Sequence, residues 1–186
     1  MAGHLLFVFG SMWMMRRVIE TERLVLRPLE AGDAAAIAAL AGDIDVSRMT
    51  SRIPHPLTAE EAGRWIAALA GAAEVVFAVL HEGELVGCTG CAPLSERRAE
   101  IGYWIGKPWW GRGFATEAVR ALVAQAFAAG DYDELASGHF ADNPASARVL
   151  EKAGFRYTHD ERRMCVARGR EVLSREYVLA RGEARR

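Results

Sequence analysis

The 186-residue chain has few cysteines, almost no net charge and no long hydrophobic run, and each shortage argues against a class of protein. Its three cysteines are too few, and odd in number, for a disulfide framework, which favours a reducing compartment such as the cytoplasm. A formal net charge of −1 gives no basic surface of the kind that nucleic-acid-binding proteins carry. A hydrophobic content of 51% with 25% charged residues is ordinary for one globular domain.

An apolar run near the N-terminus, residues 5–9, is much shorter than the ~20 residues that span a bilayer, so no membrane partner is expected. Two arginines follow this run, whereas a signal peptide carries its positive charge before the apolar stretch. We therefore expect residues 1–18 to be a poorly ordered extension, or the natural start to lie at a later methionine, with secretion as the lesser alternative. Residues 19–181 are expected to form a single domain, and residues 182–186 a polar tail.

The most informative stretch combines a strand, a glycine-rich turn and the start of a helix. Residues 99–105 alternate and are rich in aromatic and β-branched side chains, which predicts a buried strand. Gly111 and Gly113 can turn sharply and leave backbone N–H groups unshielded. From Ala115 onward, apolar residues recur at helical spacing. The N–H groups therefore meet the positive end of a helix and form a site for an anion, most naturally a phosphate or pyrophosphate.

Two common nucleotide-binding motifs do not fit this turn. A P-loop needs Gly-Lys-Ser/Thr, whereas Gly113 is followed by Phe-Ala-Thr. A dinucleotide-binding fingerprint needs a third glycine, or an alanine, at the place that Thr116 occupies. A nucleotide-binding regulatory protein is therefore disfavoured.

The string Gly-Tyr-Trp-Ile-Gly followed by Trp-Gly-Arg-Gly-Phe-Ala-Thr-Glu-Ala, within residues 102–118, resembles the coenzyme loop of the GNAT superfamily of N-acetyltransferases. The loop pattern of that family, Gln/Arg-x-x-Gly-x-Gly/Ala, matches at Gly113 and Ala115 and departs at Trp110. The fuller string is similar to the ribosomal-protein N-terminal acetyltransferase (RimJ/RimL-like) branch, which tolerates an aromatic residue at that position. Residues 21–27, Thr-Glu-Arg-Leu-Val-Leu-Arg, resemble the opening of the same branch.

The element count and this resemblance predict an α/β fold, with a GNAT-like mixed, mostly antiparallel twisted sheet of about seven strands flanked by about four helices. The resemblance implies acetyl-coenzyme A as co-substrate, and no metal is expected. Its pyrophosphate is expected on the backbone amides of the glycine turn and its pantetheine arm beside the preceding strand. The expected coenzyme contacts are Ile105, Gly106, Gly111, Arg112, Gly113, Ala115, Thr116 and Asn143.

Local signals predict elements earlier in the chain. Asp33 is expected to cap an alanine-rich helix, residues 42–56 to form a loop, and Thr58 with Glu61 to form a capping box that opens a second helix. By resemblance, the loop and its flanking helices line the acceptor pocket. The candidate contacts on this loop are Arg48, Arg52 and His55, although charged loop residues are more often simply solvated.

Apolar runs on both sides of residues 81–84 predict an antiparallel hairpin. Its second strand contains Cys88 and Cys91 as a Cys-x-x-Cys string. That spacing puts the two thiols on opposite faces of a strand, which suits a shared metal poorly. We therefore expect buried structural thiols.

Glu100 is a carboxylate in a strand otherwise suited to burial, and it shares one face with Gly102 and Trp104. A structural interpretation pairs it with Arg97 or Arg98 at the rim of the sheet. A functional interpretation makes it a general base. The resemblance favours the second, since many GNAT enzymes carry a glutamate on this strand that relays a proton.

Asn143, Pro144 and Gly154 mark the start and end of a helix by local rules. The helix resembles the coenzyme-binding helix of the family, in which a tyrosine often protonates the leaving thiolate. Leu150 stands at that place and cannot donate a proton. By family spacing, Ser146 is the candidate acid, whereas the structural alternative is a hydroxyl that bonds backbone N–H groups at the helix end.

The resemblance therefore predicts an N-acetyltransferase in which a primary amine attacks acetyl-coenzyme A directly. The alternative is a catalytically idle acyl-coenzyme A-binding or sensor module, which the leucine at position 150 suggests. The expected partner is a small-molecule amine or the N-terminus of a peptide or protein, and not nucleic acid. A homodimer is left open beside a monomer.

Overall fold

The computed structural model describes residues 18–129 and 132–183 of the chain. The predicted N-terminal extension lies outside these residues apart from Val18, and so do residues 184–186 of the predicted tail. Within the described ranges, none of the helices has the length and apolar character needed to cross a membrane.

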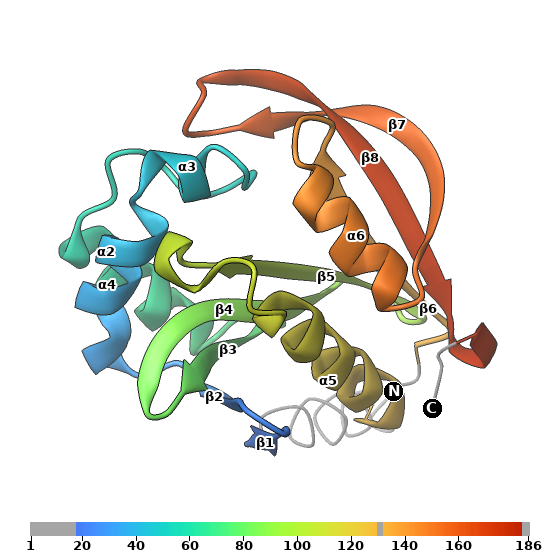
Figure 1. The fold of residues 1–186 in the computed structure, drawn as a ribbon, viewed down its shortest axis with the longest axis horizontal. Coiled ribbons are helices and arrows are strands. Elements are labelled where there is room, and N and C mark those ends of the chain that lie inside the picture. Colours follow the sequence, from blue (N-terminus) through green and yellow to red (C-terminus); the bar gives the residue numbers. More distant parts are fainter. Residues whose placement is uncertain (1–17, 130–131, 184–186) are drawn as a thin grey trace, which may run out of the picture.

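An eight-stranded sheet with strand order β1-β2-β3-β4-β5-β6-β8-β7 forms the centre of the molecule (Figure 1). Every neighbouring pair is antiparallel except β5 and β6, which are parallel. The prediction of a mixed, mostly antiparallel sheet is confirmed, with eight strands where about seven were expected. The strands are β1 (Ile19–Glu20), β2 (Val25–Pro28), β3 (Val75–His81), β4 (Glu84–Pro93), β5 (Arg98–Ile105), β6 (Glu134–Phe140), β7 (Arg156–Cys165) and β8 (Arg170–Ala180).

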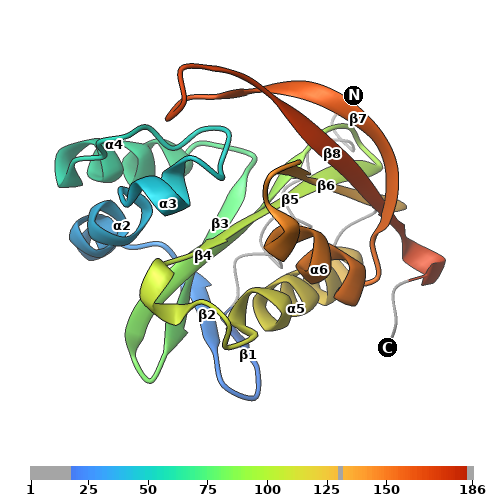
Figure 2. The ribbon, with the colours of Figure 1, turned by 45° about the horizontal axis from the view of Figure 1, so that its top comes forward.

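Helices cover both faces of this sheet (Figures 1 and 2). The helices are α2 (Ala34–Ala41), α3 (Ile44–Ser47), α4 (Ala59–Leu69), α5 (Phe114–Ala129) and α6 (Pro144–Lys152). Ile101 of β5 belongs to the core that α5 and α6 cover, whereas Trp104 packs against the core that α2 and α4 cover. Alternate residues of β5 therefore face different layers, which we call the α6 side and the α4 side.

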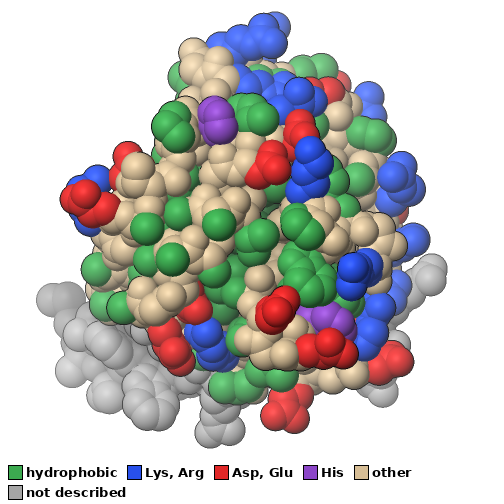
Figure 3. All heavy atoms as spheres, turned by 60° about the vertical axis from the view of Figure 1, so that its left-hand side comes forward, with side chains coloured by type: hydrophobic (Ala, Val, Ile, Leu, Met, Phe, Trp, Pro, Cys, Tyr) green, Lys and Arg blue, Asp and Glu red, His purple; other side chains and the backbone are tan. Residues whose placement is uncertain are grey.

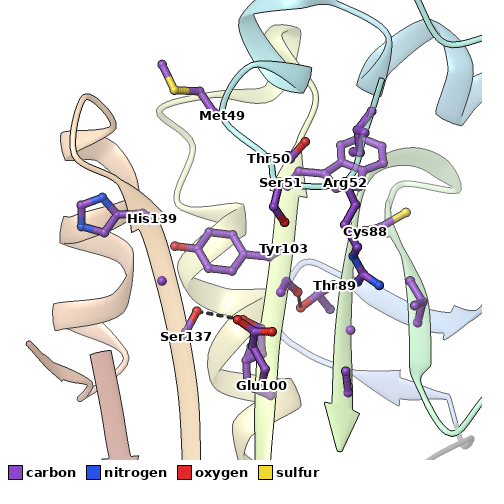
Figure 4. A pocket seen from close by; sticks show the side chains of 18 of the residues that line it. Met49, Thr50, Ser51, Arg52, Cys88, Thr89, Glu100, Tyr103, Ser137 and His139 are labelled. Atoms are coloured by element: carbon purple, nitrogen blue, oxygen red, sulfur yellow. Dashed lines mark hydrogen bonds between the residues drawn. The ribbon is translucent and has the colours of Figure 1, made fainter. Parts of the chain in front are cut away.

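β5 and β6 pair over only three residues of each strand, ending at Glu100 and Ala136. Just beyond this point, the Ser137 hydroxyl donates to the carbonyl of Ile101 at 2.8 Å. After that the described strands continue without a shared ladder, which leaves an opening between them. Figure 4 looks into this opening, with the ring of Tyr103 between the two strands.

For the N-terminal part of the α4 side, some of the predictions from local sequence are confirmed and others are wrong. The capping box is confirmed, since the Thr58 hydroxyl accepts from the N–H of Glu61 at 3.2 Å and the Glu61 carboxylate accepts from the N–H of Thr58 at 2.8 Å. The prediction that the Asp33 side chain caps α2 is wrong, because its carboxylate accepts bidentate bonds from Arg27 instead. The predicted loop contains α3, whose N-cap is Asp43.

Cys88 and Cys91 are both buried, and they lie in different core clusters. The prediction that they occupy opposite faces of their strand is thus confirmed. Burial raises the pKa of both thiols, that of Cys91 to about 12. Across the described ranges, His, Cys, Asp and Glu side chains form no group that could hold a metal ion.

Acidic and basic side chains are interspersed on the face that carries α2 and α4 (Figure 3). Arg64 bonds Glu60 one turn earlier on α4 at 2.6 Å. Lys107 pairs with Asp45 of α3 at 2.7 Å. This mixture of signs agrees with the formal net charge of −1.

Candidate active site

A cavity of about 450 Å³ lies at the opening between β5 and β6. Its walls come from distant parts of the chain, which include α2, residues 49–54, α4, the strands β3 to β8, and α6. Figure 4 shows Glu100 and Tyr103 of β5 with Ser137 of β6 around this cavity. The cavity thus begins where pairing between the two parallel strands stops.

β5 presents different side chains to the two parts of the cavity. Ile101 and Tyr103 face the α6 side, whereas Glu100, Gly102 and Trp104 face the α4 side. Glu100 is also the last residue of β5 that pairs with β6. Its carboxylate therefore lies at the apex of the opening, the point at which the two strands separate. Ligands bound on the α6 side and on the α4 side can meet there.

Glu100 belongs to a cluster of carboxylates around Arg163 of β7. The guanidinium donates to Glu100 at 2.5 Å, to Glu161 at 2.5 Å and to Glu176 at 2.7 Å. The structural interpretation that pairs Glu100 with a neighbouring arginine is wrong: those two arginines bond Asp133 and Glu134. The partner of Glu100 is instead Arg163, which is 63 positions away in the sequence.

The charges of this cluster do not balance, since one guanidinium faces three carboxylates. Burial raises the pKa of Glu176, although the bond from Ser174 and the charge of Arg163 oppose this effect. Burial lowers the pKa of Arg163, but its bond to Glu100 and its other carboxylate partners outweigh that effect and raise it. The cluster therefore holds excess negative charge beside the cavity, which favours a cationic ligand.

The α6 side of the cavity carries hydroxyl groups. The Tyr103 hydroxyl donates to the carbonyl of Ser146 at 3.2 Å. Ser146 and Asn143 are joined by two further bonds of 3.1 Å, in which the serine N–H donates to the asparagine oxygen and the asparagine amide donates to the serine hydroxyl. Asn143 thereby caps α6, and the Ser146 hydroxyl bonds a side chain rather than backbone N–H groups.

The glycine turn lies next to the cavity-lining strand, at the N-terminus of α5. Gly111 and Gly113 have φ angles of +76° and +83°, a conformation that residues with a Cβ rarely adopt. Arg112 lies between them and stacks its guanidinium on Trp109, 4.8 Å from the ring centre. The first amides of α5 have no partner within the helix, so the turn and the helix start present donors for an anion.

The family of the chain follows from comparison with known proteins. A model of the acetyltransferase (GNAT) domain matches residues 23–156. The chain belongs to the GNAT acetyltransferase family. Proteins of this family use acetyl-coenzyme A, and the chain is accordingly an N-acetyltransferase with that donor.

Similar proteins support the same family. The chain is 33% identical over 154 residues to the uncharacterized N-acetyltransferase YoaA of Bacillus subtilis, covering 74% of this chain and 82% of YoaA. It is 31% identical over 83 residues to the ribosomal-protein-serine acetyltransferase of Escherichia coli, covering 43% and 46% of the two chains. It shares its fold with RimJ of Mycobacterium smegmatis, solved in complex with CoA-disulfide, at a TM-score of 0.82 with 21% identity over 91% of this chain and 90% of RimJ.

Two hydroxyl groups are candidates to replace the tyrosine that the family often carries at position 150. Leu150 is fully buried in the core, so that position contributes packing. Ser146, the acid predicted from family spacing, lines the cavity. Sequence reasoning missed Tyr103, whose hydroxyl lies beside Ser146 and whose pKa is raised by burial. The alternation of β5 could have found it, because Tyr103 lies on the side opposite Glu100.

Ile105 and Gly106, two predicted coenzyme contacts, connect the cavity to the glycine turn. The carbonyl of Ile105 accepts a bond of 2.6 Å from the indole N–H of Trp110. The N–H of Gly106 donates to the carbonyl of Val86 at 2.8 Å. These backbone groups are therefore already engaged, and the cavity is lined by the preceding residues of β5.

The helix that follows the glycine turn is anchored to the start of the chain. Glu117 of α5 pairs with Arg23 at 2.6 Å and accepts from the Thr21 hydroxyl at the same distance. Arg23 also donates to the carbonyl of Arg112 at 3.0 Å. Burial raises the pKa of Glu117, but the bonds from Thr21 and Arg23 outweigh this and lower it. Residues at the start of the chain thus anchor the predicted pyrophosphate loop, which has Ala115 and Thr116 in the first turn of the helix.

The hairpin of β7 and β8 arches toward α3 and meets the loop before α4 (Figure 2). Arg168, at its tip, donates to the carbonyl of Arg48 at 2.8 Å and pairs with Asp142 at 2.9 Å. Of the three candidate contacts on the loop, Arg52 lines the cavity, whereas Arg48 and His55 do not belong to its lining. The tip of the hairpin therefore holds the loop in place over the α4 side.

Proposed function

We propose that this acetyltransferase acetylates the α-amine at the N-terminus of a peptide or protein. The observation that carries the proposal is the position of the Glu100 carboxylate in the cavity, at the apex of the opening between β5 and β6. An amine is protonated at neutral pH and fits beside a carboxylate cluster with excess negative charge. A ribosomal-protein-serine acetyltransferase among the similar proteins supports a protein acceptor.

The donor binds on the α6 side in this proposal. The pyrophosphate lies on the amides of Gly111, Arg112, Gly113, Ala115 and Thr116, where positive φ angles and a helix N-terminus favour an anion. The pantetheine arm passes Ile105 and Gly106 and reaches Asn143. The acetyl group then enters the opening between β5 and β6.

Glu100 acts as the general base, directly or through water. A neutral amine is required for attack on the thioester, so one proton must leave the ammonium. The bond from Arg163 orients the Glu100 carboxylate toward the cavity. Attack creates an oxyanion, which backbone N–H groups of β5 that face the opening stabilise.

The leaving thiolate receives a hydrogen bond or a proton from the α6 side. Ser146 and Tyr103 are the candidates, since both line the cavity and both carry a hydroxyl. A coenzyme A thiolate is a fair leaving group, so stabilisation by one donor is sufficient. We expect the enzyme to work in the cytoplasm, in keeping with free thiols at all its cysteines.

An acetyl-transfer screen tests the proposal. Purified protein is incubated with acetyl-coenzyme A and equal concentrations of peptides, free amino acids, polyamines or aminoglycosides. Released thiol is measured, and mass spectrometry locates the acetyl group. We expect transfer to peptide α-amines. Transfer confined to small amines would contradict the proposed acceptor, and coenzyme binding without transfer to any amine would indicate the idle module.

A further inference from the structure

The α4 side of β5 carries a carboxylate, a gap and an indole in regular succession. These are Glu100, Gly102 and Trp104, and all line the cavity. Alternate residues of a strand are spaced by about 7 Å. A molecule lying along this face therefore meets a charged group first and an aromatic group about 13 Å further on.

Gly102 leaves room between these two groups. A Cβ added at Gly102 would meet no atom within 4 Å, so the position borders open space. A side chain there would project into the cavity, because the residue shares its face with Glu100. The glycine thus allows a ligand to lie directly against the strand.

The far end of the cavity on this side is apolar. Trp104 is joined there by five residues of α2, α4, β3 and the preceding loop: Ile37, Ile53, Leu57, Trp65 and Val76. Five of these six side chains are only partly buried, so they are available to a ligand as well as packed on the core. We call this group the apolar subsite.

The cationic groups of the cavity are already paired. Among the described lining residues the arginines are Arg52 and Arg163. Arg52 bonds Glu74 at 2.5 Å, and Arg163 bonds three carboxylates. A carboxylate on the acceptor would therefore compete with carboxylates of the protein, which disfavours a free amino acid.

From this arrangement we infer that the acceptor carries a large apolar side chain on the residue whose amine is acetylated. The inference rests on the proposed function and specifies its substrate. The amine lies at Glu100, the backbone passes over Gly102, and a side chain such as that of leucine, methionine or phenylalanine fills the apolar subsite. The rest of the peptide extends out of the cavity, and its first peptide group replaces the carboxylate that a free amino acid would bring.

Peptides that differ only in their first residue test the inference. We expect kcat/KM for N-terminal leucine or phenylalanine to exceed that for N-terminal glycine or serine by about tenfold or more, since even one methylene in an apolar pocket changes this ratio about 10–200-fold. Leucinamide should likewise be a better acceptor than leucine. Equal values of kcat/KM across the peptides would overturn the inference.

Gly102→Ala is the matched variant, because its added methyl group meets no protein atom and leaves the fold unstrained. It should lower kcat/KM for the leucine peptide about tenfold and for the glycine peptide less, with an unchanged Kd for acetyl-coenzyme A. Gly71→Ala is the control: its Cβ also meets nothing within 4 Å, and Gly71 does not belong to the cavity lining, so all values should stay unchanged. Equal losses with both peptides in Gly102→Ala would contradict the inference.

Small amines separate this inference from the proposed function. If no peptide is acetylated, 3-methylbutylamine and 2-phenylethylamine are compared with ethanolamine. A preference for the apolar amines would support the apolar subsite and contradict the proposal of a peptide acceptor. Equal rates would overturn the apolar subsite, and no transfer to either set would overturn both proposals.

Discussion

On the α6 side of β5 the cavity offers the hydroxyls of Tyr103 and Ser146, and the glycine turn nearby offers backbone amides. On the α4 side it offers the carboxylate of Glu100, held by Arg163, and the indole of Trp104. The first side suits a large phosphate-bearing donor that many enzymes share. The second suits a cationic acceptor that differs between enzymes. One strand thus separates the recognition of the two substrates, and variants on its two sides should have separable effects.

Glu100→Gln is expected to have the largest effect. Loss of the base should lower kcat by about 10²–10⁴-fold, while the Kd for acetyl-coenzyme A stays nearly constant because the residue lies on the α4 side. Steady-state rates and calorimetry measure the two quantities. Glu161→Gln is the matched comparison, since Glu161 bonds the same guanidinium but does not belong to the cavity lining. A larger loss of kcat in Glu161→Gln than in Glu100→Gln would indicate that Glu161 of β7 is the base.

Gly113→Asp should affect the other substrate. The new Cβ occupies a position with positive φ, and the new carboxylate repels the pyrophosphate. We expect the calorimetric Kd for acetyl-coenzyme A to rise about 100-fold, or about 2.8 kcal/mol. Gly169→Asp controls for backbone strain, because Gly169 also has a positive φ, of 60°, but lies in the turn between β7 and β8. An unchanged Kd in Gly113→Asp would remove the glycine turn from the coenzyme site.

Ser146→Ala and Tyr103→Phe should have smaller effects, because the thiolate leaves readily. The variant that lacks the true donor should lose about tenfold in kcat and in kcat/KM alike, as expected for an interaction made in the transition state. Melting temperatures measured on the same proteins distinguish this from loss of helix capping. If both variants retain full kcat, neither hydroxyl assists the leaving thiolate.

Asp33→Asn should leave kcat/KM unchanged and affect only stability. Burial raises the pKa of Asp33, but the bonds from Arg27 and from the N–H of Glu30 outweigh this and lower it. A carboxyl group whose pKa is lowered on folding stabilises the protein above its unfolded pKa of about 3.9, and this contribution is lost as the pH falls through its folded pKa. We expect a loss of about 2 kcal/mol at pH 7, which shrinks below about pH 4. Urea unfolding at pH 7 and pH 3 measures it; a loss that grows on acidification would contradict the account.

The sequence predicts much of the α6 side because its signals are local. The strand before the glycine turn, the turn itself and the caps of α6 each depend on residues within about one or two helical turns of one another. Gly111 and Gly113 have the positive φ angles that glycine permits, and Asn143 caps its helix as predicted. Such features need no knowledge of the rest of the fold.

The α4 side could not be predicted in the same way. The partner of Glu100 lies on β7, and its position depends on the register of β7 with β8, which shifts between Tyr157 and His159. Asp33 pairs with Arg27 of β2 rather than capping the helix that follows it, and the local capping signal does not reveal this choice. Side chains from between residues 37 and 174 meet in one cavity, so tertiary contacts rather than local propensities decide its chemistry.

The separation of the two substrates by β5 is tested most directly by a crystal structure with a conjugate that joins coenzyme A, through an acetyl bridge on sulfur, to the α-amine of a leucine-initiated peptide. The account predicts the pyrophosphate at the amides of residues 111–116 and the acetyl bridge between β5 and β6. The peptide nitrogen should lie next to Glu100, with the leucine side chain near Trp104. A conjugate whose peptide lies on the α6 side, or whose pyrophosphate lies away from the glycine turn, would contradict it.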